Sequence, residues 1–478
     1  MLSDKKVKDL IFKIERHPDT FKYEAQGVSL FFLLRFSIEM EIRKAYNEVP
    51  DNLRVTGAQN NAHKKKQIPK QVSKIRAWVN QRIIHLKFRR YISLPGKLVK
   101  TPCIFVAHLD ITPKRPRTEN LLAALKYLHK KKLTTTLVIN DFTQKTKKPS
   151  YLKQLLFLFS FPPAKNVSKV QLPVTFLEHL KQLTQVDFTH CQASWESNIN
   201  TQLSNASRLE QIIAQTSCQH VFCSSAYTNA WIILACHRQK VNCVEIQHGV
   251  ITQEQAYYQA SFPPSELSPL TLLMPDYILT LGKKWQEIIV GNHYAHTNQN
   301  TLVLGNIALS NVSESPQAIP QNGLYHILVA TQPGIFDIKD TLVELCTRHK
   351  EELLQNNMMF TIRPHPLHDF DFYRELCSQH PKIFQFDNSR KTHIYASLNQ
   401  VNAVLSNTSM CLYEALALQK TAISFEKFKT QTVEEDLKFV KTTSELIRLL
   451  LEEKEHKPSK HPDYLSVFEE GVLDKFYK

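Results

Sequence analysis

The stretch YHILVATQPGIFDIKDTLVELCTRHKEELLQNNMMFTIRPHP, residues 325–366, decides the fold class. One apolar run opens the stretch, a second lies near its end, and a segment with helical patterning separates them. Short apolar runs that alternate with helical patterns are typical of parallel strands joined by crossover helices. The stretch therefore predicts a doubly wound α/β fold.

The same alternation continues on both sides and forms two series. In the first series, candidate strands lie at 103–109, 134–140, 220–225 and 243–249. A break rich in Ser and Pro, SFPPSELSPL at 261–270, precedes the second series, which has candidate strands at 276–282, 301–306, 325–332, 359–366, 403–409 and 421–425. Two such series joined by a linker predict two Rossmann-like domains that face each other across a cleft.

The pattern divides the 478 residues into four segments. Residues 1–100 form a helical, basic region that belongs to the N-terminal domain, and residues 101–265 complete that domain. Residues 266–440 form the C-terminal domain. Residues 441–478 form a helical tail, which we expect to pack across the two domains. A chain of this length exceeds one hydrophobic core, in agreement with two large domains.

Charge and cysteine content limit the class of protein. Lys and Arg number 60 and Asp and Glu 44, so the net charge is +16, which predicts attraction to phosphates, anionic lipid or nucleic acid. No uncharged apolar run of about 18 residues occurs, and the start MLSDKKVKDL lacks the order of a secretion signal, so we expect a cytoplasmic protein. The nine Cys form no Cys-x-x-Cys pair, so we expect core thiols and no metal site.

Two patterns precede the strand series. VSLFFLLRFSIEMEIRKAY, residues 28–46, has its apolar residues on a helical period and predicts an amphipathic helix. Residues 60–100 are strongly basic, with Trp78, Ile83 and Phe88 interleaved among the charges. This segment fits either peripheral contact with an anionic membrane surface or a solvated helix packed on its own domain, and both alternatives stay open.

The first candidate site is Arg363-Pro364-His365-Pro366, directly after an apolar run. Side chains just past the carboxyl end of a strand face the ligand crevice of an open α/β sheet. We therefore expect Arg363 and His365 to project toward the ligand. A guanidinium fork beside an imidazole held between two prolines suits a phosphate. The alternative is a turn with a capping His.

The second candidate site is the run Ser406-Asn407-Thr408-Ser409 between an apolar strand and the helical stretch MCLYEALALQK. Backbone N–H groups at a helix start favour an anion, and Ser406, Thr408 and Ser409 can cap the helix or bond a phosphate. Glu414 in the second turn could accept the hydroxyls of a ribose. The alternative is an ordinary capped helix with a surface Glu.

Two further candidates lie in the first series. Gln247-His248-Gly249 follows a strand near the linker, where Gly249 would allow a sharp turn and close approach of a ligand. Asp110, after the first strand, is our candidate base for the acceptor hydroxyl, with His108 and Glu119 as competitors and a helix-capping Asp as the alternative. We assign His248 and Asp110 to catalysis.

Other signatures are weak or missing in the sequence. Asp369-Phe370-Asp371 superficially matches a metal-binding DxD motif, but its polar surroundings indicate a solvated loop. The sequence has neither a Walker phosphate loop nor a GxGxxG fingerprint, which removes the main support for an ATPase or a dinucleotide-dependent dehydrogenase.

Five motifs occur in an ordered set: EIQHG at 245–249, PDYILTLG at 275–282, VLGN at 303–306, TIRPHP at 361–366 and LSNTSMCLYEAL at 405–416. The set resembles bacterial capsule and surface polysaccharide transferases, the group that holds capsular Kdo transferases, polysialyltransferases and teichoic-acid glycerophosphotransferases. The resemblance covers roughly residues 240–430 and implies a GT-B enzyme.

The resemblance also implies a site and a reaction. His365 and Pro366 would contact the donor phosphate, joined by Ser406, Thr408 and Ser409, with Gln247 and His248 nearby. From its place in the turn, Gly249 is added to the donor-binding residues. The donor would be a nucleotide-sugar, typically a CMP-linked acid such as Kdo or a sialic acid, and the acceptor a glycan or glycolipid. We expect a glycosyltransferase that needs no metal or other cofactor and binds no nucleic acid. The alternatives are polyol-phosphate transfer from CDP-glycerol and a non-catalytic protein that binds membrane or nucleic acid.

Overall fold

A computed structural model describes most of the chain. The described residues are 4–46, 98–107, 116–133, 135–139, 154–158, 161, 169–253, 256–261, 273–291, 295–312, 323–332, 338–366, 368–407, 409–425, 437–454 and 463–477. The basic segment 60–97 and the candidate base Asp110, with His108, lie outside them. None of the helices within the described ranges is long and apolar enough to cross a membrane.

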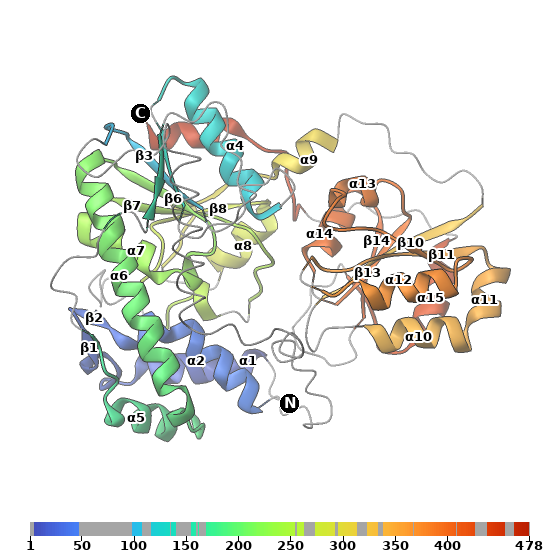
Figure 1. The fold of residues 1–478 in the computed structure, drawn as a ribbon, viewed down its shortest axis with the longest axis horizontal. Coiled ribbons are helices and arrows are strands. Elements are labelled where there is room, and N and C mark those ends of the chain that lie inside the picture. Colours follow the sequence, from blue (N-terminus) through green and yellow to red (C-terminus); the bar gives the residue numbers. More distant parts are fainter. Residues whose placement is uncertain are drawn as a thin grey trace, which may run out of the picture.

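The first domain contains a parallel sheet of seven strands (Figure 1). Its strands are β3 (Cys103–Ala107), β4 (Thr135–Ile139), β5 (Gln154–Phe157), β6 (His220–Cys223), β7 (Asn242–Ile246), β8 (Tyr277–Thr280) and β9 (Thr301–Val303). The order across the sheet is β5-β4-β3-β6-β7-β8-β9. The chain therefore moves outward from β3 to β5, returns to the other side of β3, and moves outward again.

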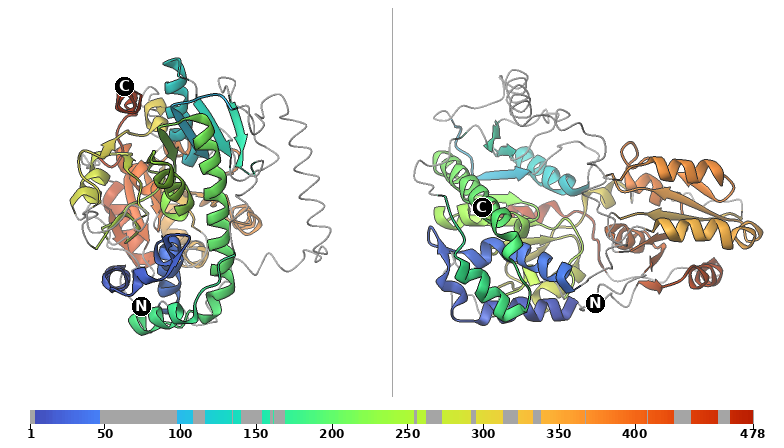
Figure 2. Two further views of the ribbon diagram at one scale, coloured as in Figure 1. Left: turned by 90° about the vertical axis from the view of Figure 1, so that its left-hand side faces the viewer. Right: turned by 60° about the horizontal axis from the view of Figure 1, so that its bottom comes forward.

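Helices cover this sheet and enlarge the first domain. They are α4 (Pro116–Lys130), α5 (Val174–Thr184), α6 (Gln192–Thr216), α7 (Ala230–Gln239), α8 (Lys283–Gly291) and α9 (Ile307–Val312), with the short helices η4 (Thr189–Cys191), η5 (Ala226–Thr228) and η6 (Ala256–Tyr258). Figure 2 shows the long helix α6 running past the N-terminal helices to α5. Apolar residues of α6 and α7 share one core cluster with the N-terminal helices.

The N-terminal region consists of α1 (Asp4–Arg16), η1 (Thr20–Lys22), the hairpin of β1 (Glu24–Ala25) and β2 (Val28–Ser29), and α2 (Leu30–Tyr46). The predicted amphipathic helix is therefore present as α2. The charges that interrupt its apolar pattern are paired: Arg35 lies 3.2 Å from Glu15 of α1, and Arg43 lies 2.8 Å from Glu39. Pairing lets these charges lie beside the core.

The second domain contains a parallel sheet of six strands in the order β12-β11-β10-β13-β14-β15. The strands are β10 (Tyr325–Ala330), β11 (Met358–Arg363), β12 (Phe384–Phe386), β13 (Ala403–Ser406), β14 (Thr421–Phe425) and β15 (Lys438–Val440). The helices are α10 (Lys339–Arg348), α11 (Lys350–Gln355), α12 (Asp371–Gln379), α13 (Ile394–Leu398), α14 (Met410–Ala417) and α15 (Thr443–Lys454). Two doubly wound α/β domains, as predicted, are confirmed.

The boundary between the domains differs from the prediction. The sequence assigned 276–282 and 301–306 to the second domain, but β8 pairs with β7 and β9 pairs with β8 in the first sheet. The break at 261–270 therefore lies within the first domain, and the chain changes sheets between β9 and β10. A strand pattern does not specify which sheet a strand joins, because the pairing partner is set by tertiary contacts.

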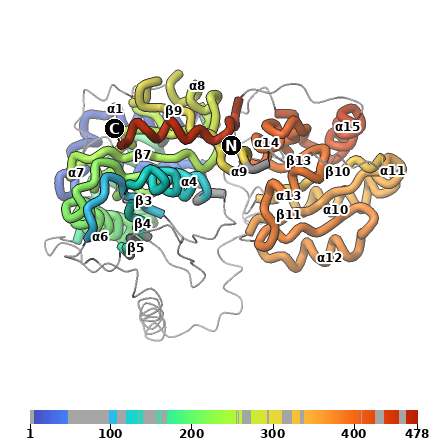
Figure 3. Tube along the Cα trace, turned by 90° about the horizontal axis from the view of Figure 1, so that it is seen from above, coloured from blue at the N-terminus to red at the C-terminus, as the bar shows by residue number. Residues whose placement is uncertain are grey.

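The C-terminal segment returns to the first domain, as expected for a tail that packs across both. Leu446 and Leu450 of α15 belong to the core of the second domain. Leu473 and Phe476 of η9 (Glu470–Phe476) pack in the cluster around β3 and β6. Figure 3 shows this red segment running along the first domain beside β9 and β7.

The return explains two glycines of the sequence motifs. A Cβ on Gly282 would lie 2.3 Å from the backbone of Tyr464, and a Cβ on Gly305 would lie 2.1 Å from the carbonyl oxygen of Val467. Gly305 also has φ +81°, in the region that favours glycine. Both positions need glycine because the returning backbone passes directly over them.

Candidate functional site

The two sheets have equivalent topological switch points. In the first sheet the strand order reverses between β3 and β6, and in the second between β10 and β13. Ligands of open α/β sheets bind outside the carboxyl ends of the strands at such points. The segments after these strands are therefore where a site is expected. Ser409 and Glu414 follow β13, whereas His365 follows the neighbouring strand β11 and His248 follows β7.

His365 and Ser409 lie at the same edge of the second sheet. β11 and β13 both pair in parallel with β10, with Ala330 opposite Arg363 and Val329 opposite Leu405. Ser406 is buried and donates a hydrogen bond to the carbonyl oxygen of Ala330, at 2.6 Å. That bond ties β13 to β10 at the switch point and uses the hydroxyl hydrogen of Ser406, whose predicted phosphate contact stays a prediction.

Arg363 also differs from the prediction. Its side chain is buried and forms an ion pair with Asp387, whose nearest oxygen is 2.5 Å away. The guanidinium donates further hydrogen bonds to Thr392 and Ser397. Arg363 therefore fixes the 387–397 loop against β11 and does not project toward a ligand, because a carboxylate lies within reach of its donor fork.

The turn after β11 is held from two sides. The backbone N–H of His365 donates to the hydroxyl of Thr331, at 3.1 Å, and the same hydroxyl lies 2.9 Å from Nδ1 of His368. Arg390 donates to the carbonyl oxygens of Pro366 and His368. The imidazole of His365 is half-buried on this fixed turn, which agrees with a rigidly placed donor at the sheet edge.

Ser409 caps the helix that follows β13. Its hydroxyl oxygen accepts from the backbone N–H of Cys411, at 3.3 Å, so α14 begins as the sequence predicted. Thr408 lies outside the described residues. The start of α14 thus presents backbone N–H groups at the switch point, where an anion is favoured.

Glu414 is buried, whereas the sequence suggested a carboxylate open to a ribose. Burial raises the pKa of Glu414 to about 7, and the positive charge of His393 and hydrogen bonds from Cys411 and Tyr395 oppose that rise. The side chain is 4% exposed. The carboxylate of Glu414 therefore lies beneath the surface of the second domain. It can act on a ligand only through its neighbours His393, Tyr395 and Cys411.

The junction joins the two domains through a histidine that the sequence did not indicate. Nε2 of His393, just before α13, lies 3.0 Å from Oε1 of Glu119 in the first turn of α4. Nδ1 of His393 accepts from the backbone N–H of Tyr395, so the hydrogen faces Glu119. The hydrogen bond to Glu119 raises the pKa of His393.

Polar contacts surround this pair. The amide of Asn306, in the VLGN motif, donates to the hydroxyl of Tyr395, at 3.3 Å, and Oδ1 of Asn120 accepts from the backbone N–H of Ile307. In Figure 1, α4 and α9 of the first domain lie next to α13 and α14 of the second. A carboxylate, an imidazole and a capped helix start therefore meet where the switch points of the two sheets face each other.

A second group lies at the carboxyl ends of β6 and β7. The hydroxyl of Ser225 lies 2.9 Å from Nε2 of His248, and the ring of Tyr227 stacks on the same imidazole. Ser225 has φ +56°, a conformation that few non-glycine residues adopt. His248 is thus held at the edge of the first sheet, between a strained serine and an aromatic ring.

Glu245 lies below this group. It is fully buried, and burial raises its pKa to about 7, although the hydroxyl of Tyr258 donates to it at 2.8 Å. Backbone hydrogen bonds from Ser225 and Ala226 also act on the carboxylate. Glu245 therefore holds the turn that presents Ser225 to His248.

Gln247 has a structural explanation, and Gly249 has none. The side chain of Gln247 is buried, accepts from the backbone N–H of Leu281 and donates to the carbonyl oxygen of Gly249, each at 2.8 Å. A Cβ on Gly249 would meet no atom within 4 Å, so sterics do not require glycine there. The amide of Gln247 fixes the turn on which His248 lies, and its predicted ligand contact stays a prediction.

No family model and no curated protein match this chain. Among solved structures it resembles the UDP-GlcNAc 2-epimerase of Neisseria meningitidis bound to UDP-GlcNAc (15% identity, TM-score 0.46, 78% of this chain and 97% of that chain). It also resembles S. aureus MnaA with UDP (12%, 0.47, 78% and 94%) and a glycosyltransferase from Rickettsia africae (12%, 0.44, 74% and 88%). At these identities none of them indicates a substrate for this chain.

The arrangement of the two domains identifies the architecture. Two parallel sheets of the same winding, each with its switch point at the junction, and a C-terminal segment that returns to the first domain, form the GT-B architecture predicted from the sequence.

Proposed function

We propose that this chain is a glycosyltransferase that uses a nucleotide-activated sugar. The observation that carries the proposal is the Glu119–His393 contact, which joins the two switch points through a carboxylate and an imidazole. Glycosyl transfer needs a base for the acceptor hydroxyl and positive or hydrogen-bonding groups for the departing phosphate. The junction offers both, one from each domain.

In this proposal the second domain binds the donor. The phosphates lie over the start of α14, with Ser409 and Thr408, and near His365 and Pro366 after β11. The imidazolium of His393 then exchanges its partner, because a phosphate oxygen competes with Glu119 for the Nε2 hydrogen. The departing phosphate is stabilised by a fixed cation and by helix N–H groups, without a step that requires a metal.

The first domain provides the acceptor side. Once a phosphate occupies His393, the carboxylate of Glu119 is released to accept the proton of the acceptor hydroxyl. Asp110, on the segment that precedes α4, remains the second candidate for this base, and His248 with Ser225 is placed to bind the acceptor glycan or glycolipid. We also propose that the enzyme works at the cytoplasmic face of a membrane.

The donor is tested directly with CMP-, UDP-, CDP- and GDP-activated sugars. We expect the chain to release one of these nucleotides in the presence of acceptor, and mass spectrometry to show a sugar without phosphate on the product. A phosphate-containing product would favour polyol-phosphate transfer from CDP-glycerol. UDP is included because two of the structural neighbours are described with UDP or UDP-GlcNAc.

Three variants test the assigned residues. Glu119→Gln and His365→Ala should each lower turnover at least ~100-fold, the scale of a lost general base or phosphate donor, while the variants stay folded. Glu178→Gln, on the exposed face of α5, is the matched control and should keep full turnover. Near-normal turnover in both test variants would overturn the proposed site.

A further inference from the structure

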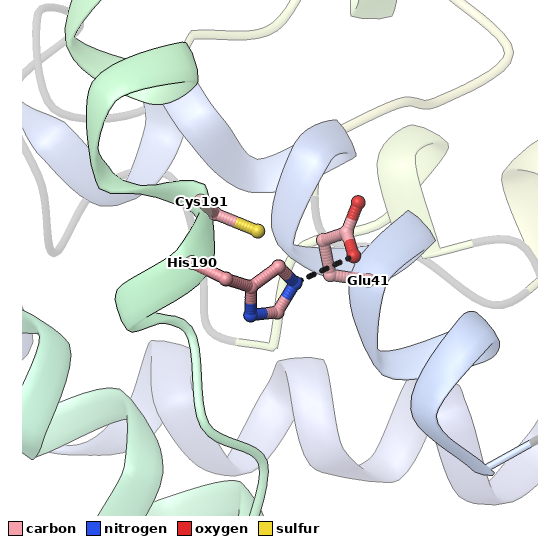
Figure 4. A group of neighbouring side chains, drawn as sticks. All are labelled: Glu41, His190 and Cys191. Carbon is pink, nitrogen blue, oxygen red and sulfur yellow. Dashed lines mark ion pairs between the residues drawn. The ribbon is translucent and has the colours of Figure 1, made fainter.

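Three side chains that can bind a metal ion meet in the helical part of the first domain. Glu41 lies near the end of α2, and His190 and Cys191 lie in η4, directly before α6. A carboxylate oxygen, an imidazole nitrogen and the thiol sulfur all lie within 4.8 Å of one another. Figure 4 shows the three side chains pointing toward one another from the two elements.

The distance between His190 and Glu41 fits a tetrahedral zinc site. Zn²⁺ is bound by sulfur, nitrogen and oxygen at about 2.0–2.3 Å, which sets neighbouring ligand atoms about 3.3–3.7 Å apart. Nε2 of His190 and Oε2 of Glu41 are 3.6 Å apart. The side chain of His190 is 65% exposed, so its ring can turn to complete the geometry without disturbing the core.

The charges also fit. Lys44 pairs with the other oxygen of Glu41, Oε1, so Oε2 faces the imidazole. Binding of Zn²⁺ forms a zinc–sulfur bond and releases the thiol proton of Cys191 to solvent. One thiolate and one carboxylate then neutralise the two positive charges of the ion.

We propose that Glu41, His190 and Cys191 bind one Zn²⁺, with a water molecule as the fourth ligand. The ion links the end of α2 to the start of α6, two elements that are far apart in sequence. Its place is among helices, away from the sheet edges that form the domain junction, so the ion fastens the N-terminal helices to the domain. This proposal is independent of the glycosyltransferase proposal.

Cobalt is the probe, because a thiolate–Co²⁺ bond has a charge-transfer band in the near ultraviolet. We expect metal-free protein titrated with Co²⁺ alone to develop this band up to one ion per chain, and Zn²⁺ to abolish it. Cys191→Ser and His190→Ala should lose the band. Cys346→Ser is the matched control, since Cys346 is also 4% exposed, and should retain it.

Thermal unfolding with Zn²⁺ supplies a second readout. Zinc should raise the melting temperature of the unchanged chain and of Cys346→Ser, and should leave that of His190→Ala unchanged. His190 is exposed, so its replacement does not threaten folding. The proposal is overturned if no band forms, if the band persists in Cys191→Ser, or if zinc stabilises His190→Ala as much as the unchanged chain.

Discussion

The buried carboxylate of Glu414 makes stability depend on pH in a way that one substitution should remove. Burial raises its pKa from the ordinary 4.5 to about 7. The unfolded chain therefore releases this proton at a lower pH than the folded chain, and folding loses stability as the pH rises between these two values. Each pKa unit corresponds to ~1.4 kcal/mol, so the ionised form costs about 3 kcal/mol above the folded pKa.

Glu414→Gln keeps the size of the side chain and cannot ionise. We expect the variant to be more stable than the unchanged chain by about 3 kcal/mol at about pH 8, relative to their difference at about pH 4.5. The assay is urea unfolding across this pH range, with Glu178→Gln on the exposed face of α5 as the control that should follow the unchanged chain. A difference between Glu414→Gln and the unchanged chain that stays constant with pH would refute the assignment of a buried, protonated carboxyl.

Three further predictions concern the junction and the fold. The pKa of His393 is raised, so its pairing with Glu119 stabilises the fold below the ordinary pKa of 6.5, and this contribution is lost as pH rises through the folded pKa. Glu119→Gln should therefore lower the free energy of unfolding in urea by ~1 kcal/mol at about pH 5.5 and by little at about pH 9. A loss that is the same at both pH values would contradict the pairing. Gly305→Ala should lower the free energy of unfolding by at least ~2 kcal/mol, because its Cβ meets the carbonyl of Val467. The Cβ of Gly471→Ala meets nothing, so this control should unfold like the unchanged chain. Equal effects of the two substitutions would show that the returning segment does not press on Gly305. Arg363→Lys should lower the free energy of unfolding by ~2 kcal/mol, because an ammonium cannot satisfy Asp387, Thr392 and Ser397 together, and calorimetry showing no loss would contradict the structural role of Arg363.

Strand positions were largely predictable from the sequence, because short apolar runs bounded by polar and turn-forming residues identify buried parallel strands. The run 421–425 coincides with β14, and 103–109 contains β3. Predicted strands usually extended past the observed end, since the polar residues after each strand belong to the sheet edge. The strands β12 and β15 were missed because each has only three residues, and β5 was missed although it lies in the apolar run LLFLFSF, residues 155–161.

The reason why Gly282 and Gly305 are glycines could be found only in the folded structure. The motifs that end in Gly282 and Gly305 could be quoted from the sequence, yet their cause is the backbone of residues 463–467, about 160 or more residues later in the chain. The sequence also placed a domain boundary at the Pro-rich break, because a polar break looks the same whether the next strand joins the old sheet or a new one.

The site was predictable at the level of sheet edges and not of side-chain roles. The switch-point rule placed His365 and Ser409 at one edge. It could not show that Asp387 lies against Arg363, or that Glu414 points inward, because both depend on packing. His393 has no motif around it: only the meeting of the two domains places it at Glu119.

The central claim is that a nucleotide-sugar binds where the domains meet, with His393 on its phosphates. Calorimetric titration of the unchanged chain, His393→Ala and His380→Ala with CMP, UDP, CDP and GDP tests it most directly, since His380 ends α12 and lies outside the junction set. We predict saturable binding of one nucleotide, weakened about tenfold or more in His393→Ala, as for a lost charge-assisted hydrogen bond, and unchanged in His380→Ala. Failure of every nucleotide to bind, or equal affinities in the two variants, would contradict the claim.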